Sequence, residues 1–308
     1  MQKYYKKWFW FFTSPALIFF VLVVIIPFLT GVLYSFTNWR NTYFYANGNG
    51  TVDGYKTDKW YEAFIGFKNY IKAFNSEEFG SALVYTFAFT FVAVLLINTV
   101  SLLLAVLLTN IRTGKGPLRA IFFMPNLLSG LALGFIWQFI FEYVFTKILF
   151  GKNSILHIEF FCNMTHDRWK ALFALAFMAT WQMAGYMMII YINGLNNIPT
   201  ELYEAADMDG ANVWQKFKIV TMPLLMPSIT IVFFLTLANS FKLFDQNVAL
   251  TNGTFNTRMI ALNIVQEISD RADLGYGIAQ AEAIIFFVIV AIITLLQVSF
   301  TKKREVEA

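Results

Sequence analysis

Charged side chains are scarce in this sequence of 308 residues, where Asp, Glu, Lys and Arg together make up 14%. A water-soluble domain has roughly a quarter of its residues charged, because its surface must be hydrated. Hydrophobic residues instead make up 58% of the chain, and the mean hydropathy is +0.57. They occur in blocks long enough to cross a hydrocarbon layer, which takes about 20 helical residues. The composition excludes an ordinary soluble domain and indicates a polytopic membrane protein.

Cysteine, histidine and nucleotide-binding motifs are also scarce or missing. Cys162 is the one cysteine, so it cannot form an internal disulfide. His157 and His166 are nine positions apart, which is too loose a spacing to predict a metal site. No GxxxxGK loop followed by Ser or Thr occurs in the sequence, so we expect this chain to bind no ATP and no cofactor of its own. The sequence thus gives no sign of a metalloenzyme or an ATPase.

Six apolar blocks predict six transmembrane helices, because each block is long enough to span as a helix. The first block follows a basic start, as in a signal peptide. It is too long for one and lacks a small-x-small cleavage pattern, so we expect it to be retained. The predicted spans are residues 8–36, 82–108, 121–141, 171–192, 223–244 and 283–300.

Basic residues near the block ends predict that both termini face the cytoplasm. The connections on the other side hold as many Lys and Arg in total, but they are about twice as long, so basic density close to the spans decides. Clusters beside apolar blocks are typical of membrane flanks and do not indicate a nucleic-acid partner. The residues that set this orientation are Lys3, Lys6, Lys7, Arg112, Lys115, Arg119, Lys216, Lys218, Lys302, Lys303 and Arg304.

One cytoplasmic connection, about residues 193–229, is long, amphipathic and charged with both signs. It should therefore fold in water, against a partner. Thr200 is a good N-cap for a helix over residues 201–209. Gly210 supplies the left-handed residue that ends this helix, and a second short helix is predicted over residues 213–220.

Two segments of this loop, "EAADMDGA" and "MPLLMP", resemble the "EAA…G…LP" loop of the inner-membrane permeases of binding-protein-dependent ABC importers. The resemblance implies an all-α polytopic membrane protein with six transmembrane helices and a cytoplasmic coupling helix. This is the type I ABC importer permease fold, here as a single permease domain over residues 1–308. The loop would bind in a cleft of a separate ATPase, through Glu204, Ala205, Ala206, Asp209 and Gly210. The alternative is a plain amphipathic surface helix.

Further stretches resemble the sugar branch of that family, of the maltose and multiple-sugar type and as the first permease of the pair. They include "GFKNYIKAF", "FFMPNLLSGLALGFIWQFIF", "WQMAGYMMIIYINGLNNIP", "FKLFDQNVALTNG" and "DLGYGIAQAEAIIFF". One departure is that Gly253 is followed by Thr254 and Phe255, where the family commonly has Gly-Pro. The resemblance implies a sugar importer of the bacterial cytoplasmic membrane. Its partners would be a second homologous permease, an ATPase dimer holding ATP and Mg, an extracytoplasmic sugar-binding protein and membrane lipid.

Polar side chains within the spans are expected to face a cavity or another helix, because facing lipid costs a few kcal/mol. Gln182 and Tyr186 share one helix face, and Asn239 and Ser240 lie at similar depth in the next span. Amides, hydroxyls and rings suit a neutral sugar, and the matching stretches of maltose-type permeases line the sugar path. We therefore predict that these four residues line the substrate path. The alternative is that they bond neighbouring helices.

Other polar and small residues are interpreted as architecture. For Asn98 and Gln138 we favour hydrogen bonding between helices. Gly130 and Gly134 form a small-xxx-small stripe that permits close helix packing. Lys242 and Asp245 are three residues apart, and we expect them to pair with each other.

Other functions remain as alternatives at this point. One is a permease for another small neutral or polyol-type solute. An ion-coupled secondary carrier usually needs acidic residues inside the membrane, and a membrane-embedded enzyme needs catalytic His or carboxylates at a span end. Neither feature is evident in the six blocks.

Overall fold

The computed structural model describes residues 2–46, 54–111, 113–152, 156–270 and 276–303. Two of the basic residues used for the orientation, Arg112 and Arg304, lie outside the described residues. The chain forms two compact units. Unit 1 comprises Met1–Gly80 and Asn263–Phe287, and unit 2 comprises Ser81–Leu262 and Val288–Ala308.

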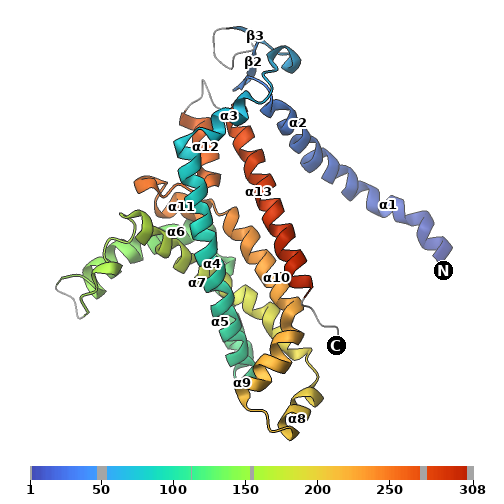
Figure 1. The fold of residues 1–308 in the computed structure, drawn as a ribbon, viewed down its shortest axis with the longest axis vertical. Helices are drawn as coiled ribbons and strands as arrows, with labels where there is room; N and C mark the ends of the chain where they lie inside the picture. The colour runs from blue at the N-terminus through green and yellow to red at the C-terminus, as the bar shows by residue number, and fades with distance from the viewer. Residues whose placement is uncertain (1, 47–53, 112, 153–155, 271–275, 304–308) are drawn as a thin grey trace. The chain divides into compact units, whose positions relative to one another are not determined.

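The described part of the chain contains six helical segments that are long and apolar enough to cross a membrane, as predicted (Figure 1). They are Trp8–Ser35, Glu77–Asn110, Gly130–Leu149, Arg168–Asn196, Val213–Phe241 and Tyr276–Lys302. The second, fourth and sixth are single α-helices, labelled α4, α7 and α13. The first comprises most of α1 (Gln2–Phe20), the π-helical η1 (Val21–Ile25) and α2 (Ile26–Ser35).

The third span differs from the prediction of one helix over residues 121–141. The chain forms α5 (Lys115–Phe123) and a 3-10 turn η3 (Met124–Leu127), and only then α6 (Gly130–Phe139) and the π-helical η4 (Ile140–Leu149). Pro125 lacks the N–H that would continue the helical ladder, and Leu128 is extended at φ −76°, ψ 141°. The candidate span therefore starts nine residues later, at Gly130 rather than at residue 121.

Unit 1 carries a small antiparallel sheet in the connection between the first and second candidate spans. Its strands are β1 (Trp39–Arg40), β2 (Tyr43–Ala46) and β3 (Tyr55–Thr57), in the order β1-β2-β3. Beyond the sheet, η2 (Trp60–Ala63) and α3 (Lys68–Phe74) follow. Asn69 of α3 donates to the carbonyls of Ser35 and Thr37, at 2.8 Å each, which ties α3 to the end of α2.

A carboxylate braces β3 against η2. Thr57 Oγ1 donates to Glu62 at 2.8 Å, and Lys59 Nζ lies 3.2 Å from the same carboxylate. The pKa of Glu62 is lowered mainly by the hydrogen bond from Thr57, and to a smaller extent by Lys59. Unit 1 also contains most of α12 (Ile260–Asp270) and the start of α13.

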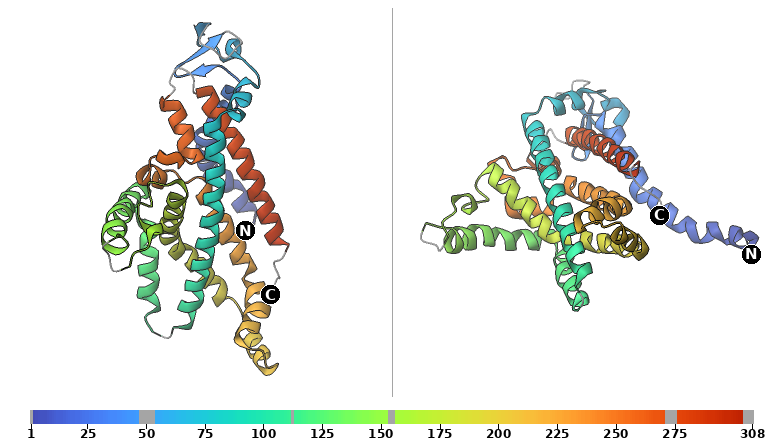
Figure 2. Two further views of the ribbon diagram at one scale, coloured as in Figure 1. Left: turned by 60° about the vertical axis from the view of Figure 1, so that its left-hand side comes forward. Right: turned by 60° about the horizontal axis from the view of Figure 1, so that its bottom comes forward.

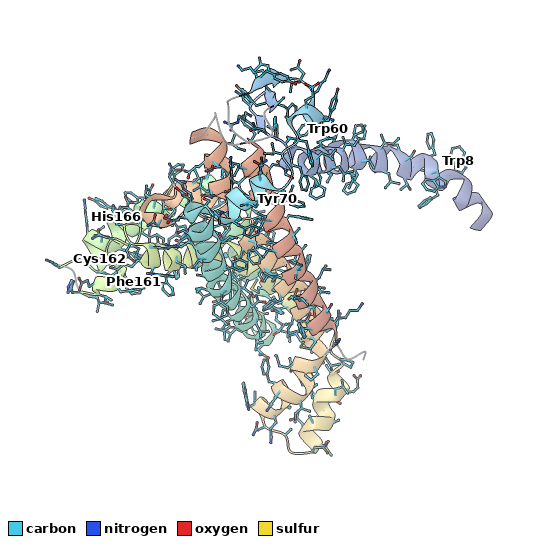
Figure 3. All side chains as sticks on the ribbon, turned by 45° about the horizontal axis from the view of Figure 1, so that its top comes forward. Trp8, Trp60, Tyr70, Phe161, Cys162 and His166 are labelled. Carbon is cyan, nitrogen blue, oxygen red and sulfur yellow. The ribbon has the colours of Figure 1, made fainter. Side chains whose placement is uncertain are left out.

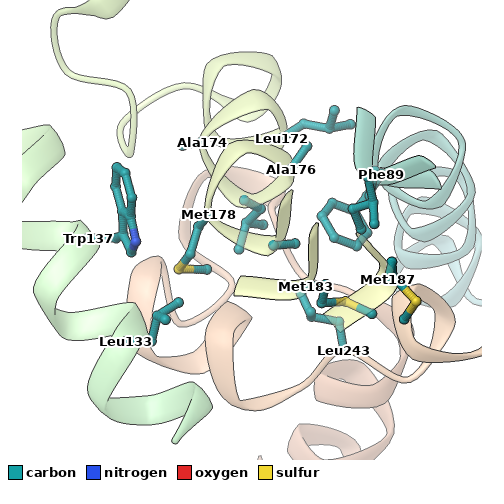
Figure 4. Close-up of a cluster of buried hydrophobic side chains, with 14 of the residues drawn as sticks. Phe89, Leu133, Trp137, Leu172, Ala174, Ala176, Met178, Met183, Met187 and Leu243 are labelled. Carbon is teal, nitrogen blue, oxygen red and sulfur yellow. The ribbon is translucent and has the colours of Figure 1, made fainter. Parts of the chain in front are cut away.

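Unit 2 is built around α7, which is rich in Ala and Met and lies against α5 and α10 (Met222–Phe241) (Figure 2). Within its most apolar stretch, 67% of the residues are buried, far more than in the other candidate spans. Small residues permit this close approach: a Cβ on Gly185 would collide with the backbone of Phe122. Figure 4 shows the core around α7, formed by Phe89, Leu133, Trp137, Leu172, Met178, Met183, Met187 and Leu243.

Two architectural predictions are confirmed in unit 2. Asn98 of α4 accepts from the Tyr191 hydroxyl at 2.9 Å and donates to Thr236 Oγ1 at 3.0 Å, so it bonds both α7 and α10. Gly130 and Gly134 of α6 pack on α11 (Asp245–Leu250), because a Cβ on either would collide with the side chain of Asp245 or Ala249. The fifth span ends at Phe241, three residues before the predicted end, and α11 starts after the turn.

Candidate functional site

The loop after α7 folds as a short helix with a glycine stop. Helix α8 comprises Thr200–Met208, and Gly210 follows at φ +76°. The Gly210 N–H donates to the Asp207 carbonyl at 3.0 Å, and the Ala211 N–H donates to the Ala206 carbonyl at 2.9 Å. These two bonds form a Schellman motif, which satisfies carbonyls that the helix end leaves free. The predicted helix and its stop are confirmed.

The start of α8 and the second helix of the loop differ from the predictions. Pro199, not Thr200, occupies the N-cap position, and no side chain caps the helix there. The segment after Gly210 begins with a capping box, in which Asn212 and Gln215 each accept the other's backbone N–H at 2.9 and 2.8 Å. It does not end near residue 220, because α9 (Val213–Lys216) runs through η6 (Phe217–Thr221) directly into α10.

Two side-chain contacts hold α8 against η6 and α9, and we refer to them together as the loop clasp. Lys216 Nζ pairs with Asp207 Oδ1 at 2.6 Å. Tyr203 and Thr221 share a hydrogen bond of 2.9 Å between their hydroxyls. Because η6 continues into α10, the clasp connects the position of α8 to a membrane span.

The tip of the loop carries an exposed apolar surface. Met208, Val213 and Trp214 are 89%, 80% and 70% exposed, and the Trp214 ring stacks on Phe217 at 5.8 Å. Large apolar side chains gathered on one exposed surface are typical of a protein interface. The sequence reasoning missed these three residues because exposure cannot be read from residue type. Of the predicted coupling residues, Glu204, Ala205, Asp209 and Gly210 are exposed and Ala206 is partly buried.

A cavity of about 430 Å³ lies among α7, η3, α10 and α11. It brings together three of the four residues predicted for the substrate path, namely Gln182, Tyr186 and Asn239. Ser240 does not line this cavity. It is buried, and its hydroxyl has no hydrogen-bond partner among the described residues. Consecutive helix positions point about 100° apart, so Asn239 and Ser240 face different neighbours.

The polar groups of this cavity divide into two kinds. Gln182 is held by the protein, since it donates to the Leu128 carbonyl at 3.3 Å and accepts from Gln246 Nε2 at 2.8 Å. The Tyr186 hydroxyl and the Asn239 amide have no hydrogen-bond partner in the part of the chain that the structure describes. These two groups are available to a ligand.

Sequence reasoning missed Asn126, Gln246, Lys242 and Asp245 as lining residues. Asn126 lies on the broken third span, and Gln246 lies on α11, which was not predicted as a helix. The predicted pairing of Lys242 with Asp245 is wrong, because no ion pair joins them among the described residues. Asp245 instead starts α11, where the helix dipole favours an acidic residue. The cavity thus contains amides, a phenol and one charge of each sign.

The described residues contain six candidate spans, a polar cavity among the helices of unit 2 and a helical loop with an exposed apolar tip, which together define a membrane-spanning protein. Residues 98–306 match the family described as the binding-protein-dependent transport system inner membrane component. The chain belongs to this family.

Curated relatives match the whole chain. It is 40% identical, over 99% of its length and 98% of the relative's, to the probable starch degradation products transport system permease protein AmyD of Thermoanaerobacterium thermosulfurigenes. It is 32% identical to the multiple sugar-binding transport system permease protein MsmF of Streptococcus mutans, over 98% and 97% of the two chains. Among solved structures, a chain of a bacterial ABC transporter for the acidic polysaccharide alginate matches with a TM-score of 0.74 at 19% identity, covering 98% of both chains. That likeness shows the fold, which is the permease fold of this kind of transporter.

Proposed function

We propose that this chain is a membrane-spanning permease of an ATP-driven sugar importer, and that it passes a mono- or oligosaccharide across the bacterial cytoplasmic membrane. The observation that carries the proposal is α8, a helix with a glycine stop, an exposed apolar tip and a clasp to a membrane span. A loop held in this way can transmit movements of a soluble ATPase to the membrane span. The relatives named for starch products and multiple sugars support a saccharide cargo.

The substrate path that we propose runs through the cavity lined by Gln182, Tyr186 and Asn239. The free Tyr186 hydroxyl and Asn239 amide would bond sugar hydroxyls, and the Tyr186 ring would cover an apolar sugar face. Gln182 would mainly hold Gln246 in place, since both of its ends already bond protein groups. Ser240 is retained in the proposal only as a residue supporting this part of the path from within the helix packing.

The partners that we propose are a second homologous permease, an ATPase dimer that holds ATP and Mg, and an extracytoplasmic sugar-binding protein. Glu204, Ala205, Ala206, Asp209 and Gly210 would form the contact with the ATPase, together with the apolar tip. Both termini and the α8 loop would face the cytoplasm, as the basic flanks predict. Support for the binding protein comes from the alginate transporter, one solved structure of which is a complex with its periplasmic protein.

The test is to purify the chain with its neighbours and to measure ATP hydrolysis with a panel of sugars. Stimulation by at least one sugar-loaded binding protein is expected, with loss of stimulation when Glu204 is changed to Arg. Copurification without an ATPase, or ATP hydrolysis that no sugar changes, would contradict the proposal.

A further inference from the structure

A second cavity, of about 460 Å³, lies in unit 2 at the other end of α7 from the α8 loop. Its walls come from α6 and η4, from the segment before α7, and from the end of α11 with the loop that follows it. His166, which precedes α7, is labelled in Figure 3. Because the candidate span α7 leads from this cavity to the α8 loop, the two features lie at opposite ends of that helix. The polar and aromatic residues of the walls include Gln138, Glu142, Thr165, His166, Asn252 and Phe255.

The side chain of Gln138 is the first feature that indicates a ligand in this cavity. The sequence predicted a hydrogen bond from Gln138 to a neighbouring helix, and that prediction is wrong. Its amide lines the cavity and has no partner in the described part of the chain. Glu142 lies four residues further along the same helical segment and presents its carboxylate to the same cavity.

A short hydrogen-bond chain sets which groups face the cavity as acceptors. Thr165 Oγ1 donates to Glu142 Oε1 at 2.9 Å, and His166 Nδ1 lies 3.0 Å from the same hydroxyl. Thr165 has one proton and gives it to Glu142, so His166 must donate through Nδ1. In a neutral ring this leaves His166 Nε2 as an acceptor. The second carboxylate oxygen of Glu142 also remains without a bond to a described group.

Phe255 supplies an exposed ring on a strained backbone. It has φ +56° and ψ 33°, a left-handed conformation that bulky residues rarely adopt, yet its side chain is 54% exposed. Asn252, Gly253 and Asn256 also have positive φ. The ring contacts the His166 ring at 5.5 Å between centroids. Backbone strain of this kind clusters at active sites and ligand-binding sites, and here it places an exposed ring in a cavity wall.

Buried hydrogen bonds hold the loop that carries Phe255, which explains how the backbone strain persists. Asn247 donates to the Thr257 carbonyl at 2.9 Å and accepts the Met259 N–H at 3.0 Å. Thr257 Oγ1 donates to Thr251 Oγ1 at 2.8 Å. All three bonds are buried, so they fix both ends of the loop around Phe255.

We propose that this cavity is a second saccharide subsite, which receives one neutral sugar ring on the side opposite the α8 loop. The Phe255 ring would cover the apolar face of the sugar, while Glu142 and His166 accept from its hydroxyls and the Gln138 and Asn252 amides bond the remaining ones. The Glu142 carboxylate would repel an acidic sugar, so the subsite selects neutral saccharides over uronates. This inference depends on the proposed sugar transport, and it adds a binding site outside the path at Gln182, Tyr186 and Asn239.

The test is saturation-transfer NMR on the assembled complex in nanodiscs without its binding protein. The probes are three neutral saccharides, maltotriose, raffinose and xylotriose, with trigalacturonate as the acidic probe. Tyr186→Ala with Asn239→Ala serves as the background, so that signal from the first cavity is suppressed. We expect at least one neutral probe to bind, trigalacturonate to give no signal, and Phe255→Gly to reduce the neutral signal at least fivefold.

Phe255→Gly removes the ring while relieving the backbone strain, so the loop is expected to stay folded. Phe139→Ala is the matched control, because Phe139 is an exposed aromatic residue of α6 that does not line the cavity. Glu142→Gln should allow trigalacturonate to bind. The subsite is refuted if no neutral probe binds, if Phe255→Gly and Phe139→Ala bind equally well, or if chitosan trimer binds better than all neutral probes, which would make it an amino-sugar site. ATP hydrolysis by the unmutated complex, measured with its sugar-loaded binding protein, checks the proposed function separately.

Discussion

At Gly210 the effect of backbone conformation on the α8 loop can be tested without any change in side-chain contacts. It has φ +76°, and a Cβ added there meets nothing within 4 Å. Substitution therefore causes no collision, and its whole effect is conformational. A left-handed L-residue costs roughly 1–2 kcal/mol, with a β-branched residue at the upper end and Asn near the lower end. Gly210→Val should thus reduce the ratio of correctly to incorrectly folded loop by about 5- to 30-fold.

The assay compares Gly210→Val with Gly210→Asn in the complete complex reconstituted in proteoliposomes. Because the spans are untouched, thermal unfolding of the membrane part should be unchanged in both variants. Sugar uptake per ATP hydrolysed should fall strongly for Val and only slightly for Asn, while the binding protein still binds sugar. Wild-type uptake by Gly210→Val would refute the reasoning, and so would an equal loss in both variants, since Asn tolerates the left-handed region.

Three further predictions follow from the contacts. Asp207→Ala should lower the ratio of sugar transported to ATP hydrolysed, and exchanging the charges of Asp207 and Lys216 should restore this ratio. Because the ion pair is partly exposed, it should contribute only about 0.2–1 kcal/mol to stability. Asn239→Ala should raise KM for sugar uptake by about 2- to 12-fold, equivalent to about 0.5–1.5 kcal/mol for one hydrogen bond. For topology, a cysteine at Gly116 should react with impermeant maleimide only from inside, and a cysteine at Gly80 only from outside. Both positions are exposed and have open space for a Cβ.

Each of these predictions has its own control. If the ratio of sugar transported to ATP hydrolysed is unchanged after Asp207→Ala, the loop clasp does not link α8 to α10. For the path, Asn98→Leu should lower the melting temperature without changing KM, because its partners Val94, Tyr191 and Thr236 do not line the first cavity. A KM that is unaffected by Asn239→Ala would leave Asn239 as a packing residue. The labelling uses a Cys162→Ser background, and modification of both positions from one side would overturn the orientation.

Much of the fold could be predicted because its determinants are local in sequence. Apolar length gives the spans, and Gly210 ends α8 through its own backbone freedom. The break at Pro125 was missed because proline is tolerated in transmembrane helices, so its presence alone does not decide between a kink and an end. The sheet of unit 1 was missed because strands of two to four residues depend on their partners rather than on their own pattern.

The site was predicted only in part, for a related reason. Residue type and spacing identify polar positions within a span but not the neighbour that each one meets. Asn98 meets hydrogen-bonding groups of two neighbouring helices and Gln138 meets a cavity, although both were interpreted as contacts between helices. Asn239 and Ser240 are adjacent, yet only one lines the first cavity. These outcomes depend on helix rotation and packing, which a single sequence does not encode visibly.

The most direct test of the account is the energy source for sugar uptake in proteoliposomes that contain the chain with its partners and the sugar-loaded binding protein. We expect uptake to require ATP inside the vesicles, to persist when proton and sodium gradients are dissipated, and to be lost in Gly210→Val. Uptake that continues without ATP and stops when an ion gradient is dissipated would contradict the assignment of α8 as the link between an ATPase and the sugar path.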